Sequence, residues 1–386
     1  MLKVDYKKCT GCTACISACP KKCLEMREGE GGFQFPMPSG AAVCIGCGLC
    51  NQVCPILTPR PHLTEDTRAY AVYSQDIKER LESSSGGVFS LFARDVLSAG
   101  GIVYGAAYDC NFRVHHIAVT ETEGLYQLRG AKYAQSDMNG IFPDVQTKLM
   151  ENQYVLFTGT PCQVSGLKTF LKRDYENLIT IDFVCHGVPS PAAWSAYVKY
   201  RAKLDNKGTL PTTINLRSKS TGWSQYAYSI LFEYADGEKY SVESGHDLFM
   251  QLFVGDYINR KSCEDCQFKG YERQSDLTLG DFWGIWEIDS EMDDNKGTSL
   301  VLTHSQKGEK AFGSVCNRSR VKEVSLEDVS KFNPSMLTSS IGRAERDEVL
   351  AKIQAGSFDA VSNIFDAHSR FSRVKDKMKR IFKILT

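Results

Sequence analysis

The sequence predicts an α/β fold with a mixed, mostly parallel core sheet and added β hairpins, preceded by a small α+β module. Two short apolar runs, 154–157 and 178–184, each end in small residues and a cysteine, Cys162 or Cys185. Apolar runs of this length between glycine and proline are typical of buried parallel strands, and the loops after such strands hold ligands. From Arg68 onward strand and helix patterns alternate, which indicates an α/β core.

Length and composition exclude several classes of protein. The 386 residues suffice for two or three domains, and 42% hydrophobic with 24% charged residues is ordinary for a globular chain. Forty-six basic and 46 acidic residues cancel, so no overall field favours a nucleic-acid partner. No apolar run approaches the roughly 18 residues of a membrane helix, and the N-terminus lacks the apolar core of a signal peptide. We expect a cytoplasmic protein.

Cysteine spacing gives the first chemical signal. Fifteen cysteines without an export signal favour metal over disulfides. The pattern C-x2-C-x2-C-x3-C-P occurs twice, and it is typical of paired 4Fe-4S clusters in which the fourth cysteine of each run binds the other cluster. Zinc knuckles would explain neither the third cysteine of each run nor the prolines. The expected ligands are Cys9, Cys12, Cys15 and Cys54 for one cluster and Cys44, Cys47, Cys50 and Cys19 for the second, with Cys23 left as a packed thiol.

This N-terminal module resembles bacterial-type two-cluster ferredoxins over residues 1 to about 58. Two prolines among polar residues at 58–66 predict a linker. We therefore expect a two-cluster ferredoxin domain over residues 1–62.

The remaining elements follow in chain order. The patterns predict strands at 69–73, 102–108 and 113–120 and helices at 87–97, 141–150 and 191 to about 204. Strands at 212–217, 226–234 and 238–242 follow, the last two joined by a hairpin at Asp236-Gly237. After residue 297 we expect a last strand and helix, then a short helix capped by Ser325 with Asp328 at its third position. The expected domain parts are 66–150, 151–320 and a helical extension at 321–386.

A third metal site is expected inside the α/β region. Cys263 and Cys266 form a C-x2-C pair with no second pair nearby in sequence, and Cys162 and Cys185 would complete four ligands. The expectation is a third 4Fe-4S cluster, because an electron path that leaves the N-terminal module needs an acceptor inside the α/β region. The alternatives are zinc in the same four thiolates, or Cys162 as a redox-active thiol.

Two loops suggest a dinucleotide. Small residues at 83–86 precede the helix at 87–97, and free N–H groups at a helix start bind phosphate, although such a segment is more often only a cap. The loop 129–136 holds a cation, an aromatic ring and polar donors, and its alternative is a plain polar surface loop. Downstream of iron–sulfur clusters, the two loops together favour a flavin dinucleotide site.

Six motifs stand out in the chain: SSGG at 84–87, GAKYAQS at 130–136, FTGTPCQ at 157–163, CHGVPSP at 185–191, C-x2-C at 263–266 and SDLTLGDFWG at 275–284. As a set they resemble the coenzyme F420 hydrogenase/dehydrogenase beta-subunit family over residues 66–320. The resemblance implies FAD, with three groups of contacts. These are Ser85, Gly86 and Gly87 at the diphosphate; Lys132, Tyr133, Gln135 and Ser136 along the flavin; and Thr158, Gly159, Thr160, Gln163, His186 and Gly187 under the ring.

His186 is also the candidate catalytic residue, with the alternative that it only caps its strand loop. Residues 280–284 form either a turn beside the third cluster or part of the flavin wall.

The expected function is an oxidoreductase, dependent on FAD and on iron–sulfur clusters. A ferredoxin-like donor supplies electrons through the clusters to FAD, and a small molecule, of coenzyme F420 type or another, accepts them. The alternative is a noncatalytic electron-transfer subunit that feeds a partner enzyme. The substrate, the direction of electron flow and the oligomeric state, including a homo-oligomer, stay open.

The C-terminal stretch 369–386 predicts a basic amphipathic helix. Apolar residues recur at steps of three and four beside seven basic residues and one acid: Phe371, Val374, Met378, Phe382 and Leu385. Such a helix can pack on its own domain, lie on an anionic membrane as a peripheral contact, or dock an acidic partner.

Overall fold

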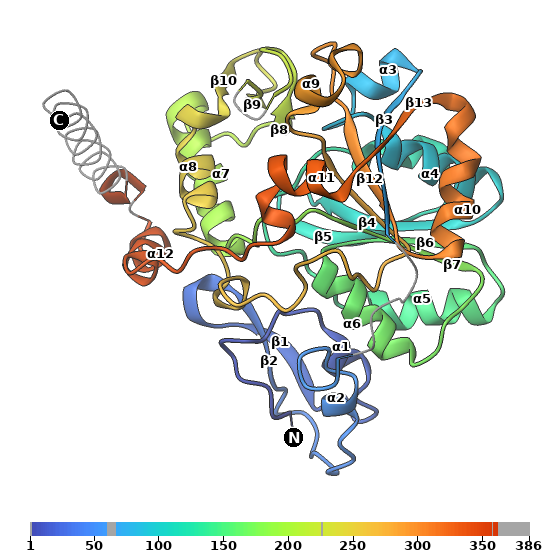
Figure 1. Cartoon of the computed structure of the whole chain (residues 1–386). Helices are drawn as coiled ribbons and strands as arrows, with labels where there is room; N and C mark the ends of the chain where they lie inside the picture. Colours follow the sequence, from blue (N-terminus) through green and yellow to red (C-terminus); the bar gives the residue numbers. More distant parts are fainter. Residues whose placement is uncertain (1, 60–66, 225–226, 357, 362–386) are drawn as a thin grey trace, which may run out of the picture.

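Figure 1 shows the computed structural model of the chain, which describes residues 2–59, 67–224, 227–356 and 358–361. Most of the expected linker at 58–66 and the whole basic stretch at 369–386 lie outside the described residues. Among the helices that the structure describes, none combines the length and the apolar character needed to cross a bilayer.

The N-terminal module has the expected small α+β form. Its strands β1 (Leu24–Glu28) and β2 (Gln34–Pro38) pair antiparallel across η1 (Glu30–Gly32), beside the short helices α1 (Ala14–Ser17) and α2 (Leu49–Gln52). Each helix starts after a residue in the left-handed region, Thr13 with φ 68° and Gly48 with φ 74°. This conformation turns the chain sharply just before the helix, so that cysteines on both sides of the turn can face one point.

The large sheet has eight strands in the order β13-β3-β12-β11-β7-β6-β4-β5. Pairings among β4, β6, β7 and β11 are parallel, and the flanking pairings are antiparallel. The α/β class with a mixed sheet is therefore confirmed, but the sheet is not mostly parallel, because only the three central pairings of its seven are parallel. The strands are β3 (Arg68–Ser74), β4 (Ile102–Tyr108), β5 (Val114–Val119), β6 (Val155–Thr158), β7 (Leu178–Phe183), β11 (Leu277–Asp281), β12 (Ser299–Thr303) and β13 (Ser319–Val324).

Helices cover both faces of this sheet. Alternate side chains of the central strands separate into two cores, one with Val103, Leu156 and Ile179 and the other with Ile102, Val155 and Leu178. The first core packs against α4 (Val88–Ser98) and α10 (Gln306–Val315), and the second against α5 (Ile141–Met150) and α6 (Pro161–Leu171). Smaller elements at the edges are α3 (Ile77–Leu81), η2 (Thr122–Gln127), α9 (Ile285–Ile288), η5 (Ser290–Met292), η6 (Cys316–Arg318), α11 (Leu326–Phe332) and η7 (Pro334–Met336).

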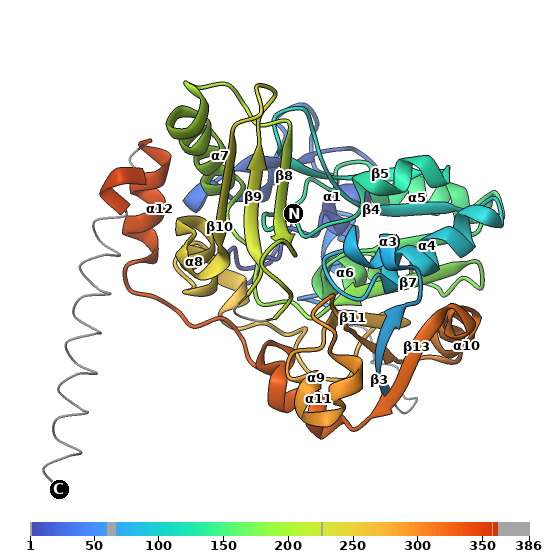
Figure 2. The ribbon, with the colours of Figure 1, turned by 90° about the horizontal axis from the view of Figure 1, so that it is seen from above.

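A second, three-stranded sheet holds the expected hairpin. Figure 2 shows β8 (Thr213–Ser218), β9 (Ser229–Glu233) and β10 (Lys239–Glu243) beside α7 (Pro191–Asn206) and α8 (Leu248–Val254). Gly237 makes the hairpin turn with φ 90°, as the Asp-Gly pair predicts. Helix α12 (Arg346–Gln354) packs on α7, while η3 (Ser244–His246) and η4 (Lys261–Cys263) flank α8.

The N-terminal module packs tightly on the rest of the chain. Ala14 and Val53 share a hydrophobic core with Phe142 of α5 and Val164 of α6, and Thr169 Oγ1 donates to the Val53 carbonyl at 2.7 Å. On its other side the β1–β2 hairpin shares a core with α7, α8 and α12. Figure 1 shows this arrangement, with the module in blue next to α6. The cysteine-bearing loops of the module therefore lie against the α/β region.

Most expected elements lie close to their observed bounds, and two strands of the large sheet were not expected. The strand at 102–108 is β4, the helix at 141–150 is α5, the helix from 191 is α7, and α11 has the expected capping box between Ser325 and Asp328. Strand β11 lies inside the SDLTLGDFWG motif, whose two glycines obscured its alternation. Strand β13 follows α10 as a further edge strand, beyond the strand expected to be last.

Candidate functional site

The first expected set of thiols surrounds one cavity. Cys9, Cys12, Cys15 and Cys54 line it together with Thr10, Pro36 and Pro55, and the space between them, including the part open to solvent, is about 330 Å³. Burial raises the pKa of the Cys12 thiol to about 12 and also raises that of Cys15. At neutral pH such thiols ionise only beside a strong cation, which iron would supply. The donors and their setting fit a metal cluster.

The second set lies toward the surface of the same module. Cys44 and Cys47 belong to the loop 40–48, in which Val43 and Ile45 are 86% and 60% exposed and Cys47 is exposed. A backbone N–H from Gly46 lowers the pKa of the Cys44 thiol. Cys23, expected to be a packed thiol, is buried, and its Sγ lies 3.3 Å from the Sγ of Cys19.

The third set comes together from distant parts of the chain. Cys162 lies in the first turn of α6, Cys185 follows β7, Cys263 ends η4, and Cys266 comes three residues later. All four line one cavity, where the space between the walls, including the part open to solvent, is about 480 Å³. Burial raises the pKa of both Cys185 and Cys263 to about 12.

Three cations border this third set. Arg260, Lys269 and Arg273 line the same cavity. The Lys269 ammonium donates to the carbonyl oxygens of Cys185 at 2.5 Å and of Ser335 at 2.7 Å. Positive side chains around four thiols favour an anionic thiolate group over neutral thiols. Among the described residues, no three His, Cys, Asp or Glu side chains converge on a point that would suit a single metal ion.

The two cavities are neighbours, because Thr10 lines both of them. Thr10 stands between Cys9 and Cys12 in sequence, and Cys12 lies against α6, whose first turn carries Cys162. The first thiol set, and not the second, is thus the one next to the α/β region. We call the first set proximal and the second set, Cys19, Cys44, Cys47 and Cys50, distal.

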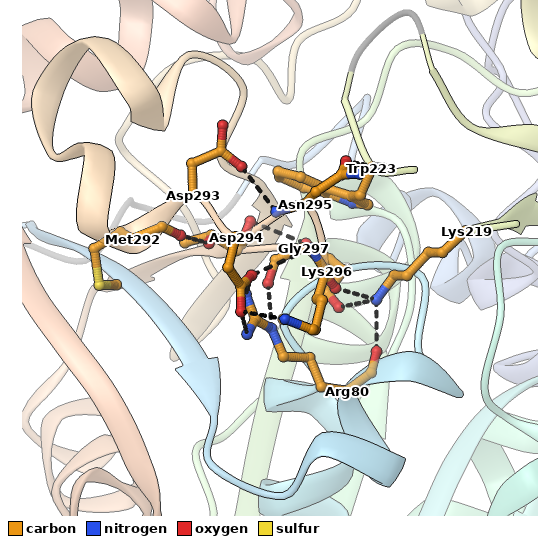
Figure 3. Close-up of polar contacts among 12 residues, drawn as sticks. Arg80, Lys219, Trp223, Met292, Asp293, Asp294, Asn295, Lys296 and Gly297 are labelled. Carbon is orange, nitrogen blue, oxygen red and sulfur yellow. Dashed lines mark hydrogen bonds and ion pairs between the residues drawn. The ribbon is translucent and has the colours of Figure 1, made fainter. Parts of the chain in front are cut away.

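The loop that contains Ser85, Gly86 and Gly87, proposed to contact the diphosphate, is held by a network of hydrogen bonds, which Figure 3 shows in part. The Lys219 ammonium donates to the carbonyls of Arg80, Ser85 and Lys296 at 2.5, 2.6 and 2.7 Å. Gly87, with φ 84°, is the N-cap of α4. Burial, followed by the charge of Arg80, lowers the pKa of Lys219 to about 7. This network fixes the loop in place beside the start of a helix.

Lys132 and Tyr133 lie in the loop before Ala134. Burial lowers the pKa of the Lys132 ammonium to about 7, and its Nζ donates to the carbonyl of Arg129 at 2.8 Å. The Tyr133 ring lies 4.9 Å from the ring of Phe253. Burial raises the pKa of Tyr133, and the charge of Arg217 acts against this rise.

Other residues expected along the flavin have partners within the protein. Gln135 Oε1 accepts hydrogen bonds from the Gln34 amide at 3.1 Å and from Arg260 Nη1 at 3.0 Å. Gln163 and Thr160 form the capping box of α6. The structure thus brings Gln135 to the contact with the N-terminal module, and Gln163 and Thr160 to the start of α6.

Of the remaining assigned residues, Ser136 lies in the loop before α5, and the others lie at or after the ends of β6 and β7. Ser136 Oγ lies 2.7 Å from His116 Nδ1, and the carbonyl oxygen of Thr158 lies 2.9 Å from His116 Nε2. Gly159 follows Thr158 directly, and its amide donates to the carbonyl of Ile181. Gly187 follows Cys185 by two residues and packs close to Ser340.

His186 borders the third thiol cavity. Its Nε2 lies 2.9 Å from Asp256 Oδ1, its Nδ1 lies 3.3 Å from Ser335 Oγ, and its ring meets Phe253 edge-on. Burial acts to raise the pKa of Asp256, but the contact with His186 lowers it overall. His186 is held by a carboxylate, the arrangement that orients an imidazole.

A buried group of polar atoms lies near Tyr133. The guanidinium of Arg217 lies 4.0 Å from the ring centre of Tyr228 and 4.8 Å from that of Trp283, and its Nη2 pairs with Asp281 Oδ2 at 2.9 Å. Within the described part of the chain, Arg217 Nε, Asp281 Oδ1 and the hydroxyl of Tyr108 have no hydrogen-bond partner. Buried polar atoms are rarely left unpaired, so this group fits a polar ligand.

Comparison with known proteins finds two matching families. Residues 152–329 match the C terminus of the coenzyme F420 hydrogenase/dehydrogenase beta subunit, and residues 8–57 match the 4Fe-4S dicluster domain. The chain thus matches a 4Fe-4S dicluster domain and, after it, this beta-subunit domain. The match to the beta-subunit domain includes all four thiols of the third set together with strand β7.

The chain is also similar to individual known proteins. The F subunit of the F420H2 dehydrogenase of Methanosarcina mazei is 22% identical over 186 residues, which are 46% of this chain and 53% of that protein. The chain thus matches about half the length of this relative. Ferredoxin-3 of Rhodobacter capsulatus is 28% identical over 74 residues, covering 14% of this chain and 73% of that protein. A chain of the F420-reducing [NiFe] hydrogenase complex from Methanosarcina barkeri has 12% identity and a TM-score of 0.47, covering 79% and 94% of the two chains.

Two functional candidates in the beta-subunit domain escaped the sequence reasoning. Arg217 lies outside the motifs and Arg260 only precedes the C-x2-C pair, and each becomes conspicuous through its buried neighbours. Asp281 and Trp283 belong to the SDLTLGDFWG motif, which is a weak indication of a functional role. The motif does not reveal that their partner is Arg217. Cys110 and Cys316 are exposed and half-buried thiols outside all three sets.

Proposed function

We propose that this protein is an iron–sulfur flavoprotein oxidoreductase that carries electrons between a ferredoxin-like partner and a small organic molecule. In this proposal residues 1–62 hold two 4Fe-4S clusters, 66–150 and 151–320 form the two parts of one flavin domain, and 321–386 are an extension. Iron–sulfur clusters move single electrons and a flavin exchanges one or two, so the set would convert between single-electron and paired-electron chemistry.

One observation carries the proposal. Four thiols from separate parts of the beta-subunit domain line one cavity, and this cavity shares Thr10 with that of the proximal thiols. A structural zinc ion would not need a second metal site next to it, whereas electron transfer between clusters requires that they lie close together. Cys162, Cys185, Cys263 and Cys266 would therefore hold a third cluster beside the proximal one.

The residues proposed for FAD divide into two parts. Ser85, Gly86 and Gly87 would present the start of α4 to the diphosphate, since backbone N–H groups at a helix start attract anions. Lys132, Tyr133 and Arg217 would surround the ring system, and the unpaired atoms at Arg217 and Asp281 support this placement. Thr158, Gly159, Gly187 and His186 remain proposals for the ring's far edge, with His186 as the candidate proton carrier.

A partner would dock near the distal thiols. Val43 and Ile45 are large exposed side chains on either side of Cys44, which suits a short-lived contact that places two redox centres close together. The contact of residues 369–386 with a membrane is a proposal from the sequence alone. The relative from Methanosarcina mazei belongs to an F420H2 dehydrogenase, so a deazaflavin such as coenzyme F420 is one substrate to test.

The test is anaerobic purification with iron, sulfide and flavin quantified. We expect about twelve irons and one FAD per chain, at four irons per cluster. Cys263→Ser should lower the iron content by about four and remove one signal from the EPR spectrum of the reduced protein. The matched control is Cys316→Ser, a half-buried thiol at the end of α10, which should keep all the iron. Stoichiometric zinc, or an unchanged spectrum for Cys263→Ser, would contradict the third cluster.

A further inference from the structure

Arg260 is a buried arginine between the two parts of the chain. It is 2% exposed, and its Nε donates to the carbonyl of Cys9 at 2.7 Å. Its Nη1 donates to the carbonyl of Gln34 and to Gln135 Oε1, both at 3.0 Å. The guanidinium also lies 4.2 Å from the ring centre of Phe35. One side of Arg260 is therefore bound to the loop that carries the first proximal thiol.

The other side of Arg260 faces the third thiol set. Arg260 lines the cavity of that set, and its carbonyl accepts from the amide of Cys263 at 2.9 Å. Its Nη2 is buried and has no hydrogen-bond partner among residues 2–59, 67–224, 227–356 and 358–361. A buried cation with an unused donor is costly unless a negative group lies beside it.

We propose that Arg260 is the charge bridge between the proximal and third clusters, a positioning residue that raises the reduction potential of both. The inference rests on the proposed function, because it needs iron–sulfur clusters in both cavities. Reduction adds one electron to a cluster and moves no atom, so a fixed positive charge nearby stabilises the reduced form. The same side chain ties the Cys9 loop to the Cys263 loop, which keeps the two cavities adjacent.

A purely structural arginine at the same contact provides the control. Arg346 is also 2% exposed, its Nε donates to the carbonyl of Asn259 at 2.7 Å, and its guanidinium lies 5.7 Å from the ring centre of Phe33. Arg260 lies 5.4 Å from the same ring. Arg346, however, is absent from the lining of both thiol cavities and pairs with Asp347. The two arginines share burial and the contact with Phe33, but of the two Arg260 alone lines a thiol cavity.

The experiment is an anaerobic redox titration of the full-length protein, followed by EPR at each potential. In Arg260→Gln the equilibrium constant for reducing the third cluster should fall about tenfold, equivalent to about 59 mV for one electron. The potential of the proximal cluster should move in the same direction, and that of the distal cluster should stay. Arg346→Gln should lower thermal stability and leave all three potentials unchanged.

A second variant decides the case in which Arg260→Gln loses iron. Gln135→Glu keeps the shape and the acceptor oxygen of Gln135 but sets a negative charge beside Arg260 Nη1, and it should lower the same two potentials. The charge bridge would be overturned if Gln135→Glu, or Arg260→Gln with its full iron content, kept the wild-type reduction potentials. It would also be overturned if Arg346→Gln shifted the potentials as much as Arg260→Gln does. A wild-type protein with only about eight irons would instead overturn the proposed function, since the third cluster would then be missing.

Discussion

Cys12 of the N-terminal module packs directly against Gly166 of α6. A Cβ atom at position 166 would lie 2.8 Å from Cys12 Sγ and 2.9 Å from Cys12 Cβ, closer than such atoms approach in proteins. The absence of a side chain at Gly166 is what lets the proximal thiol loop touch the helix that carries Cys162. The distance between the two thiol sets therefore depends on one glycine.

Gly166→Ala should push the proximal loop away from α6. The added methyl overpacks a filled contact, and we expect a cost of about 1–3 kcal/mol in stability. Lower proximal iron occupancy and faster proteolytic cleavage near residues 58–66 should accompany it. Gly313→Ala in α10 is the control, because a Cβ there would meet nothing within 4 Å. Equal iron content and cleavage rates in the two variants would contradict this view.

Arg217→Met should reduce flavin binding and spare iron. The change removes the cation that lies beside Tyr133 and Trp283 while keeping the bulk of the side chain. We expect FAD affinity to fall at least about tenfold, the effect of roughly 1.4 kcal/mol, measured by flavin release during dialysis. Arg201→Met is the control, since Arg201 likewise covers a ring, that of Tyr240, and pairs with Asp205. Full FAD retention in Arg217→Met would remove Arg217 from the proposed site.

His116 should make the protein less stable as the pH falls. Burial lowers the pKa of His116 in the folded chain to about 4, from its ordinary value of 6.5. Between these values the unfolded chain binds a proton that the folded chain does not, so stability rises with pH and is lost toward acid. The contribution of His116 is about 1.4 kcal/mol per pH unit.

His116→Gln should flatten this dependence. Thermal unfolding of wild type and variant between pH 6.5 and 5 is the measurement, with the difference in slope assigned to this side chain. His246, an exposed histidine, supplies the control variant His246→Gln, which should keep the wild-type slope. Parallel curves for wild type and His116→Gln would show that His116 is not the titrating group.

Truncation after His368 tests the C-terminal stretch, which only the sequence describes. If the apolar stripe packs on its own domain, the shortened protein should unfold at a lower temperature. If the basic residues bind an anionic membrane, it should keep its stability and its FAD but no longer sediment with anionic vesicles at low salt. If the full-length protein does not bind such vesicles, the membrane hypothesis is wrong.

The sequence by itself determined those features that depend on residues close together in the chain. Cysteines at steps of three predicted the proximal and distal sets, apolar runs predicted β6 and β7, and Ser325 with Asp328 predicted the start of α11, because each pattern acts within a few residues. The pairing of Cys162 and Cys185 with Cys263 and Cys266 could be expected by counting ligands. Their meeting at one cavity depends on the parallel order of β6, β7 and β11.

Only the tertiary structure decided the roles of single side chains. Arg217 and Arg260 are unremarkable in the sequence, and they matter because folding buries their charge beside Asp281 and beside two thiol sets. Gln135 lies in a motif but bonds to Gln34 and Arg260. Such roles follow from burial and from contacts across a hundred residues or more, and a local pattern does not contain either one.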